Sequence, residues 1–421
     1  MADVSSSIRE RRALDVALGW MLDDPIILLE GPRSVGKSTL LRQIADVRGG
    51  RVLDLDDPAE RDAVAADPSL YIDRDEFVCV DEYQNAPIVL DAIKSALNKR
   101  TEPGRFMLAG SARHDALPAA AQALTGRLTR LPIYPLSQGE LDETNETFLS
   151  EALTDANAVI RGSRSQTTRQ QYIDRVTRGG FPLAIRASSA AARGRWMDSY
   201  VELTLERDVT ELSRIRQGHL LQSLLERVAG QTAQVLNIEK AARDVGLDKA
   251  TTDSYVTLLE KVFLLYRLPA WGKTLTARSG SSPKVHVVDS GIAARLLRLT
   301  PAKLATLDPT AQTEFGHLLE TFVVNELRKQ ASWADGVSAV GHWRTHDGLE
   351  VDLVIETEDG RVIGFEVKSG SRIPGEDLRP LTKLRDAVGR NFAGGFALYL
   401  GEREYTYDDR IHVLPVDRLW T

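Results

Sequence analysis

The segment from Gly31 to Ser38, with the sequence GPRSVGKS, constrains the fold of this chain more than any other feature. The apolar run Pro25 to Leu29 precedes it and residues 37–47 follow with helical spacing, so the segment joins a buried strand to a helix. Its glycines let the backbone curl until N–H groups point at phosphate oxygens, and the helix N-terminus adds positive potential there. The pattern predicts a phosphate-binding loop on a parallel α/β sheet.

The residues of this loop are suited to hold ATP together with Mg²⁺. Lys37 supplies a point charge for the terminal phosphates, and Ser38 places its hydroxyl on Mg²⁺, because a hard cation prefers oxygen ligands. The alternative is a chance glycine turn before a helix, which the complete pattern and its position disfavour. ATP and Mg²⁺ are therefore the predicted cofactors, and the predicted cofactor-binding residues are Gly31, Pro32, Arg33, Ser34, Val35, Gly36, Lys37, Ser38 and Thr39.

Four further apolar runs in the first third of the chain read as strands. They alternate with helical segments, an order that predicts a parallel sheet. The expected strands are Arg51–Leu55, Phe77–Val80, Arg105–Ala109 and Thr129–Ile133.

Two acids follow the expected strand that ends at Val80. Asp81 and Glu82 stand at the carboxyl edge of this strand, where α/β sheets bind their ligands. Asp81 can hold Mg²⁺ through water, and Glu82 can act as the general base that polarises the attacking water. Such a pair is common at strand ends, but together with the loop it indicates a hydrolytic site.

Several other polar residues are candidates for the same chemistry. Ser111 ends the strand-like run Phe106 to Gly110, and Arg113 lies close by. Ser111 could orient the attacking water, or it could be the N-cap of a helix. Arg127 and Arg130 flank the fifth expected strand, where an arginine could reach the γ-phosphate held by a neighbouring subunit. The alternative for both arginines is a surface salt bridge. An arginine acting between subunits would make the chain a homo-oligomer.

Composition bounds the possible classes of protein. The chain has 421 residues, a formal net charge of -7 and a sequence pI of about 5.7, which argues against non-specific coating of nucleic acid. The single cysteine, Cys79, lies in an apolar run and fits a reducing compartment. Neither a signal peptide nor eighteen consecutive apolar residues can be found. We expect a cytoplasmic protein with no membrane contact.

The length predicts several domains. We expect a P-loop ATPase domain over residues 1–140, a helical linker over 141–215, a winged-helix-like domain over 216–290 and a final α/β domain over 291–421. Arginines dominate residues 157–195, a pattern more typical of a solvated helix face than of a nucleic-acid patch. In the expected recognition helix, Lys249 is offset by Asp248 and Asp253, so this region is more typical of a packing module than of a DNA reader.

Taken together, these motifs resemble the AAA+ superfamily ATPases of bacteria and archaea that carry a C-terminal domain of unknown function. The matching segments are GPRSVGKSTL, LDLDD, VDEYQ, LAGSAR, LTGRLTRLPIYPLSQGE, RGGFP, ERDV, GHLLETFVVNEL, EVDLVI and GFEVKSG. The resemblance implies an ATPase core, a helical and winged-helix region, and a C-terminal fold similar to restriction endonucleases. It also implies a role for each of six residues. Lys37 would belong to the phosphate-binding loop, Ser38 and Asp81 would hold the metal, Glu82 would be the base, Ser111 the sensor and Arg127 the arginine finger. A second sensor arginine and a helical lid are not recognisable.

A second candidate site lies near the C-terminus. Asp352 is on one expected strand, and Glu366 and Lys368 are two residues apart on the next, so their side chains share a face. With Glu320 they resemble the PD-(D/E)xK nuclease motif, in which carboxylates hold Mg²⁺ and a lysine steadies the attacking water. The alternatives are solubilising charges at a sheet edge or a binding module without chemistry.

Two hypotheses follow for the whole chain. The first is a magnesium-dependent ATPase that drives or gates a nuclease-like or DNA-binding module, in DNA processing or defence. The second is a nucleotide-gated switch that hydrolyses ATP slowly and recruits a protein partner.

Overall fold

The computed structural model describes residues 9–421 except 112–123, 125, 210–217, 273–281 and 307. The chain divides into two compact units, which are described separately. The first comprises residues 1–136 with 261–263, and the second comprises residues 137–260 with 264–421. The contacts of the second unit join the last three of the four expected domains into one body. The boundaries between those domains therefore stay a prediction.

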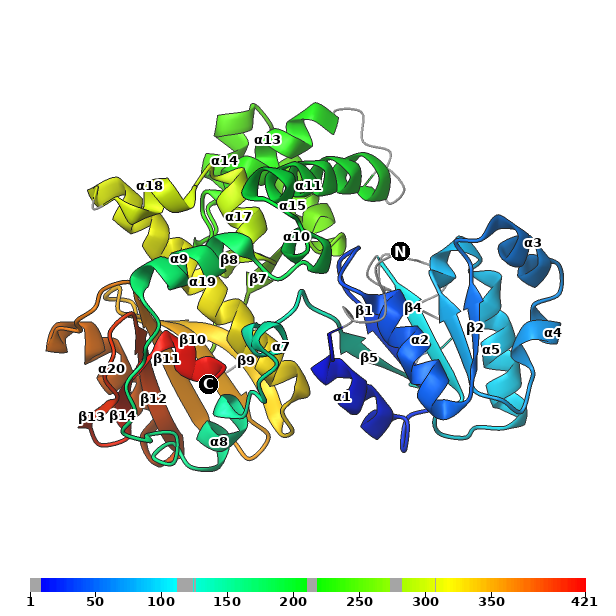
Figure 1. The fold of residues 1–421 in the computed structure, drawn as a ribbon, viewed down its shortest axis with the longest axis horizontal. Coiled ribbons are helices and arrows are strands. Elements are labelled where there is room, and N and C mark those ends of the chain that lie inside the picture. Colours follow the sequence, from blue (N-terminus) through cyan, green and yellow to red (C-terminus); the bar gives the residue numbers. More distant parts are fainter. Residues whose placement is uncertain (1–8, 112–123, 125, 210–217, 273–281, 307) are drawn as a thin grey trace. The chain divides into compact units, whose positions relative to one another are not determined.

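The first unit is built on a parallel five-stranded sheet with the order β2-β3-β4-β1-β5 (Figure 1). The strands are β1 (Ile26–Glu30), β2 (Arg51–Asp54), β3 (Val78–Asp81), β4 (Phe106–Gly110) and β5 (Leu128–Pro132). The helices are α1 (Arg12–Trp20), α2 (Lys37–Arg48), α3 (Pro58–Ala66), α4 (Pro68–Ile72), α5 (Ile88–Lys99) and the short η2 (Tyr83–Asn85). The predicted P-loop α/β fold is confirmed.

Burial explains why these strands could be recognised. Every residue of β1, β3 and β4 is buried, as in parallel sheets covered on both faces. Alternate strand residues such as Leu28 and Val80 pack with Ile93 of α5 in one core cluster. On the other face, Cys79 lies against the backbone of α2, with its Sγ 3.9 Å from the carbonyl oxygen of Leu41.

The second unit begins with helices. They are α7 (Gln138–Asp142), α8 (Phe148–Thr154), α9 (Arg169–Arg178), α10 (Pro182–Ile185), α11 (Ala190–Leu203) and the π-helix η4 (Thr204–Asp208). Next come α13 (Gly218–Ala229), β6 (Gln234–Val235), α14 (Ile238–Val245), α15 (Lys249–Lys261), β7 (Leu265–Leu268) and β8 (Lys284–Val287). The three short strands form a sheet in the order β6-β8-β7. The helices α17 (Ser290–Leu296), α18 (Pro301–Ala305) and α19 (Pro309–Trp333) follow.

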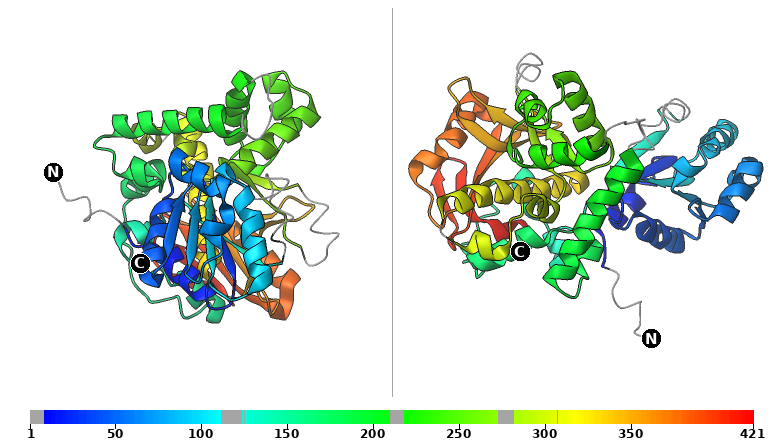
Figure 2. Two further views of the ribbon diagram at one scale, coloured as in Figure 1. Left: turned by 90° about the vertical axis from the view of Figure 1, so that its right-hand side faces the viewer. Right: turned by 90° about the horizontal axis from the view of Figure 1, so that it is seen from above.

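A mixed six-stranded sheet in the order β13-β14-β12-β11-β10-β9 completes this unit. Its strands are β9 (Val337–Arg344), β10 (Glu350–Thr357), β11 (Val362–Lys368), β12 (Phe392–Tyr399), β13 (Tyr405–Asp408) and β14 (Ile411–Pro415). The remaining helices are η5 (Gly375–Leu378), α20 (Arg379–Val388), η6 (Gly389–Asn391) and η7 (Val416–Leu419). Leu381 and Leu384 of α20 pack on one face of the sheet, and the long helix α19 contacts β10 and β11 (Figures 1 and 2). This confirms the predicted α/β character of the C-terminal part.

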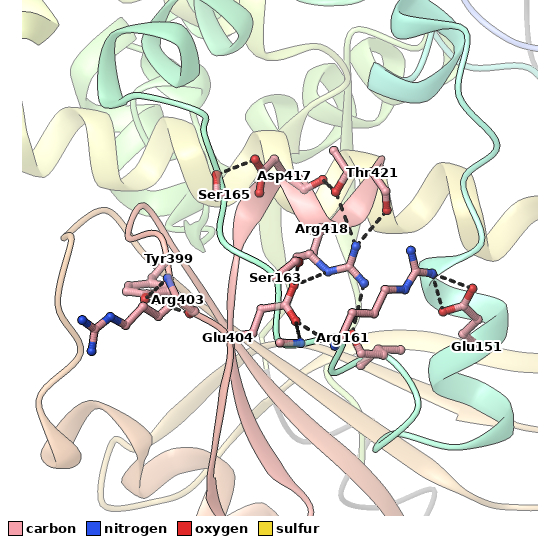
Figure 3. A network of polar contacts seen from close by, with 12 residues as sticks. Glu151, Arg161, Ser163, Ser165, Tyr399, Arg403, Glu404, Asp417, Arg418 and Thr421 are labelled. Carbon is pink, nitrogen blue, oxygen red and sulfur yellow. Dashed lines mark hydrogen bonds and ion pairs between the residues drawn. The ribbon is translucent and has the colours of Figure 1, made fainter.

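The arginine-bearing segment after α8 is attached to this C-terminal sheet (Figure 3). The backbone N–H groups of Arg161 and Gly162 donate to Glu404 Oε2 at 2.8 and 3.0 Å, and Ser163 donates to Oε1 at 2.7 Å. The guanidinium of Arg418 lies 2.8 Å from the same carboxylate, whose side chain is fully buried. Polar residues in this segment therefore fix the chain in place, instead of serving only as a solvated linker.

Candidate nucleotide-binding site and a second acidic cluster

The loop between β1 and α2 has a backbone that specific glycines permit. A Cβ atom on Gly31 would lie 2.0 Å from the carbonyl oxygen of Ile133, the residue that follows β5, so no side chain fits there. Gly36 is the N-cap of α2 with φ +95°, a left-handed conformation that favours glycine. Gly31 thus allows the loop to approach the backbone of Ile133 closely, and Gly36 allows the loop to curve into α2.

Lys37 is folded back onto the loop that precedes it. Its Nζ donates to the carbonyl oxygens of Gly31 and Pro32 at 2.9 and 2.8 Å, and the residue is only 5% exposed. The ammonium is therefore held within the curl of the loop, beside the N-terminus of α2, where a phosphate would bind.

Ser38 and Asp81, the two residues expected to hold Mg²⁺, interact with each other. Asp81 ends β3 and is nearly buried, and its carboxylate accepts a hydrogen bond from the Ser38 hydroxyl. Burial raises the pKa of Asp81, and the charge of Glu82 adds to this effect, whereas the bond from Ser38 opposes it. A hydroxyl and a carboxylate in contact are the hard oxygen donors that Mg²⁺ prefers, so these residues fit that ion.

Glu82 lies next to Ser111 and to a residue that was not predicted. Ser111 Oγ donates to Glu82 Oε2 at 3.1 Å, and Gln84 Nε2 donates to the same carboxylate oxygen and to Ser111 Oγ at 3.2 Å. Glu82 itself has φ +49°, which turns the chain directly after β3. The structure thus groups Glu82 with Ser111, and the motif VDEYQ contained the signal for Gln84.

Arg127 does not join this group within one chain. It directly precedes β5, which runs parallel to β1, so it lies at the opposite edge of the sheet from the loop that follows β1. Its Nη1 donates to Asn98 Oδ1 at 2.7 Å. Arg130 is exposed within β5, and Arg113 lies outside the described residues. Contact of Arg127 with a neighbouring subunit stays a prediction.

Arg11 supports the loop from the N-terminal side and was not predicted. Its guanidinium donates from Nη1 to Val35 O and from Nη2 to Tyr134 O, each at 2.7 Å, and the residue is nearly buried. It thereby connects the loop with the segment after β5. Arg11 is 24 positions from Val35 and 123 positions from Tyr134, and nothing in the sequence pattern marks contacts over such separations.

In the second unit, the four residues of the predicted second site lie in one cluster. Lys368 Nζ donates to Glu366 Oε1 at 2.8 Å, and Asp352 Oδ2 accepts the backbone N–H of Val367 at 2.9 Å. Glu320 of α19 joins Asp352 through a shared partner, Lys284.

Lys284 and Glu350 also belong to this cluster, although no motif in the sequence marks them. Lys284 Nζ donates to Glu320 Oε1 at 2.6 Å and to Asp352 Oδ1 at 3.0 Å, and it also pairs with Glu350. Burial would lower the pKa of Lys284, but the carboxylates of Asp352, Glu320 and Glu350 raise it well above its ordinary value. The lysine is therefore charged.

The acids of the cluster share a crowded, buried environment. Burial raises the pKa of both Glu320 and Glu366 well above the ordinary value, and the neighbouring charge of Asp352 adds to each shift. Among the residues that the structure describes, no group of three His, Cys, Asp or Glu side chains is disposed to hold a metal ion.

The charges on the expected recognition helix are also paired. Lys249, at the start of α15, lies 2.9 Å from Glu239 of α14, and Asp248 accepts hydrogen bonds from the N–H and hydroxyl of Thr251. These contacts agree with a packing module. A winged-helix assignment stays a prediction.

Three regions of the chain match known family models. Residues 23–142 match the model described as AAA domain. Residues 169–303 and 315–419 match two domains of unknown function, DUF8612 and DUF4143 respectively.

Relatives extend over nearly the whole chain. Uncharacterized proteins of Mycobacterium bovis and Mycobacterium tuberculosis are each 25% identical over 422 residues, which is 99% of this chain and 84% of theirs. Among solved structures, a Walker-type ATPase of Pyrococcus abyssi is 15% identical with a TM-score of 0.42, covering 69% of this chain and 96% of that one. A RuvB variant of Thermotoga maritima is 20% identical with a TM-score of 0.27, covering 61% and 86%.

The family match coincides with the candidate site. Residues 23–142 contain the loop, Asp81, Glu82 and Ser111, all at one edge of the parallel sheet. In the part of the chain that is described, no helix is both long and apolar enough to cross a membrane. The first unit therefore has a P-loop fold and matches an AAA domain over residues 23–142.

Proposed function

We propose that this chain hydrolyses ATP in a magnesium-dependent reaction at the edge of the first unit's sheet. The observation that carries the proposal is that Lys37, held in the loop after β1, shares the edge of the sheet with Asp81 at the end of β3 and with Glu82, which accepts a hydrogen bond from Ser111 at 3.1 Å. Bound Mg²⁺ would neutralise charge on the β- and γ-phosphates. The protein's own part in the reaction consists of binding the phosphates, holding the cation and activating the water, and each of these tasks falls to particular side chains.

Lys37 would exchange its bonds to the Gly31 and Pro32 carbonyl oxygens for the terminal phosphates. Ser38 and Asp81 would hold the cation between them. Glu82 would accept the proton of the attacking water, while Ser111 and Gln84, which now donate to Glu82 Oε2, would orient that carboxylate and the water.

Two substitutions test the assignment. Lys37→Ala should abolish ATP binding or turnover, and Glu82→Gln should retain binding but slow turnover by roughly 10²–10⁴-fold, the usual contribution of a general base. Lys94→Ala, which removes an exposed lysine of the same unit, is the matched control. Unchanged hydrolysis by purified Lys37→Ala protein would refute the assignment.

We extend the proposal to the second unit as a nuclease-like or DNA-binding module that ATP drives or gates, in DNA processing or defence. Its support is the convergence of Asp352, Glu366 and Lys368. Purified protein would be incubated with Mg²⁺ or Mn²⁺ and several forms of DNA and RNA. Cleavage that is lost in Asp352→Ala and Glu366→Ala would support a nuclease.

The alternative is a nucleotide-gated switch that recruits a protein partner in the cytoplasm without cleaving nucleic acid. Lys284 favours it, because an ammonium already occupies the centre of the acidic cluster. Absence of cleavage on every substrate, combined with ATP-dependent binding of a purified partner protein, would support the switch.

A further inference from the structure

Lys284 reaches the acidic cluster from a different element than the acids do. It begins β8, whereas Glu320 lies in α19 and both Glu350 and Asp352 lie in β10. Its side chain is 1% exposed, so the ammonium is almost completely removed from water. All three carboxylates lie within 3.0 Å of Nζ. The nitrogen is thus surrounded by carboxylate oxygens from two elements.

This arrangement is close to that of a carboxylate-bound metal ion. Mg²⁺ takes oxygen ligands at about 2.1 Å, so the carboxylates would have to move inward by less than about 1 Å to bind it. Glu320 and Glu350 also line a pocket of about 400 Å³, together with His317 and Arg344, which gives access to the cluster.

Acidic side chains outnumber basic ones in the cluster. The acids are Glu320, Glu350, Asp352 and Glu366, and the cations are Lys284, Lys368 on Glu366, and Arg344, whose Nη1 lies 3.7 Å from Glu350. Glu366, which is buried next to Asp352, has a second oxygen, Oε2, without a hydrogen-bond partner among the described residues. Removing the Lys284 side chain would therefore leave an empty space lined by buried acids, which a divalent cation can fill.

We propose that Lys284 substitutes for a divalent cation, so that Glu320, Glu350 and Asp352 bind no metal in the native chain but form a Mg²⁺ or Mn²⁺ site once the lysine side chain is removed and its space is left empty. If so, the second unit does not cleave nucleic acid with a metal at this cluster, which favours the DNA-binding and partner-binding readings of the proposed function over the nuclease. The proposal does not depend on ATP hydrolysis, and turnover measured on the same proteins tests that function separately.

The test counts Mn²⁺ bound to the nucleotide-free full-length chain by electron paramagnetic resonance. The proteins are the wild type, Asp352→Asn, Lys284→Ala, Lys284→Ala combined with Asp352→Asn, and Lys284→Met. Methionine removes the charge but fills most of the same space, so it separates lost charge from vacated volume. Any Mn²⁺ held by Ser38 and Asp81 is common to all five proteins and is subtracted.

We expect Lys284→Ala to gain about one Mn²⁺ per chain, since three carboxylates suffice for such a site. This ion should be absent from the wild type, from Lys284→Met and from the double variant. Mn²⁺ should also raise the melting temperature of Lys284→Ala alone. Asp352-dependent Mn²⁺ binding by the wild type would overturn the proposal, as would a Lys284→Ala protein that binds no ion or stays unfolded in Mn²⁺.

Discussion

A rise in pH from about 5 to 8 should destabilise the second unit through the carboxyl group of Glu146. Burial raises the pKa of Glu146 from 4.5 to about 8, and the charge of Glu326 adds to the shift. Hydrogen bonds from Ser137 Oγ at 2.6 Å and from the N–H of Gly139 at 3.0 Å oppose it. The folded protein therefore retains a proton that the unfolded chain has already lost.

The sign and size of the effect follow from this difference in bound protons. The raised pKa of Glu146 adds to the free energy of unfolding. This contribution is fully present below pH 4.5 and is lost as the pH rises through about 8. Within that window the free energy of unfolding should fall by at most about 1.4 kcal/mol per pH unit. The melting temperature should fall by roughly 2–4 °C per pH unit at that limit.

Thermal unfolding followed by tryptophan fluorescence can isolate this contribution. Of the chain's six tryptophans, all except Trp20 lie in the second unit, so the signal reports mainly on that unit. Buried histidines such as His286 and His342, whose pKa values are lowered by burial, change stability in the opposite direction. The difference between wild type and Glu146→Gln removes their effect.

We expect the wild type to lose stability relative to Glu146→Gln as the pH rises, whereas the exposed-site control Glu358→Gln should follow the wild type. Parallel stability curves for wild type and Glu146→Gln between pH 5 and 8 would refute the reasoning.

Three further predictions concern the first unit. Gly31→Ala places a Cβ 2.0 Å from Ile133 O and should destabilise the unit by about 1–3 kcal/mol and abolish binding of fluorescent ATP, whereas Gly19→Ala, whose Cβ meets nothing within 4 Å, should not. Arg11→Met removes two hydrogen bonds to backbone carbonyls and should raise the KM for ATP by about tenfold, with little change in kcat. If Arg127 acts between subunits, Arg127→Ala should hydrolyse ATP slowly, and mixing it with Lys37→Ala protein should restore part of the turnover; no recovery in the mixture would contradict that role.

Much of the first unit could be predicted because its strands are short and separated by helices, and because the three central ones, β1, β3 and β4, are wholly buried. The expected strand Phe77–Val80 is observed as Val78–Asp81, so Asp81 is the last residue of the strand instead of the first after it. The long helix α19 begins at Pro309, where the Asp308 side chain caps it. The sequence pattern located these elements but not their ends, because capping and fraying determine the terminal residues.

The sites were predictable only where local motifs carry the chemistry. Lys37 and Ser38 are adjacent in a loop whose backbone determines their positions, so a short pattern is sufficient. Lys284 is 36 residues from Glu320 and 68 from Asp352, and its role depends on which strand of the small sheet lies beside α19 and β10. No local periodicity reports that packing, and the lysine therefore looked like an ordinary charge at the start of a strand.

The two buried lysines differ in what would displace them. Lys37 donates to two neutral carbonyl oxygens, which offer less electrostatic attraction than a triphosphate, so nucleotide can take over these bonds. Lys284 contacts three carboxylates, and moving it would leave their charge buried without compensation. An incoming divalent cation would have to displace the ammonium as well as lose its own water. The same type of side chain thus keeps the first site available for a ligand and the second site closed to one.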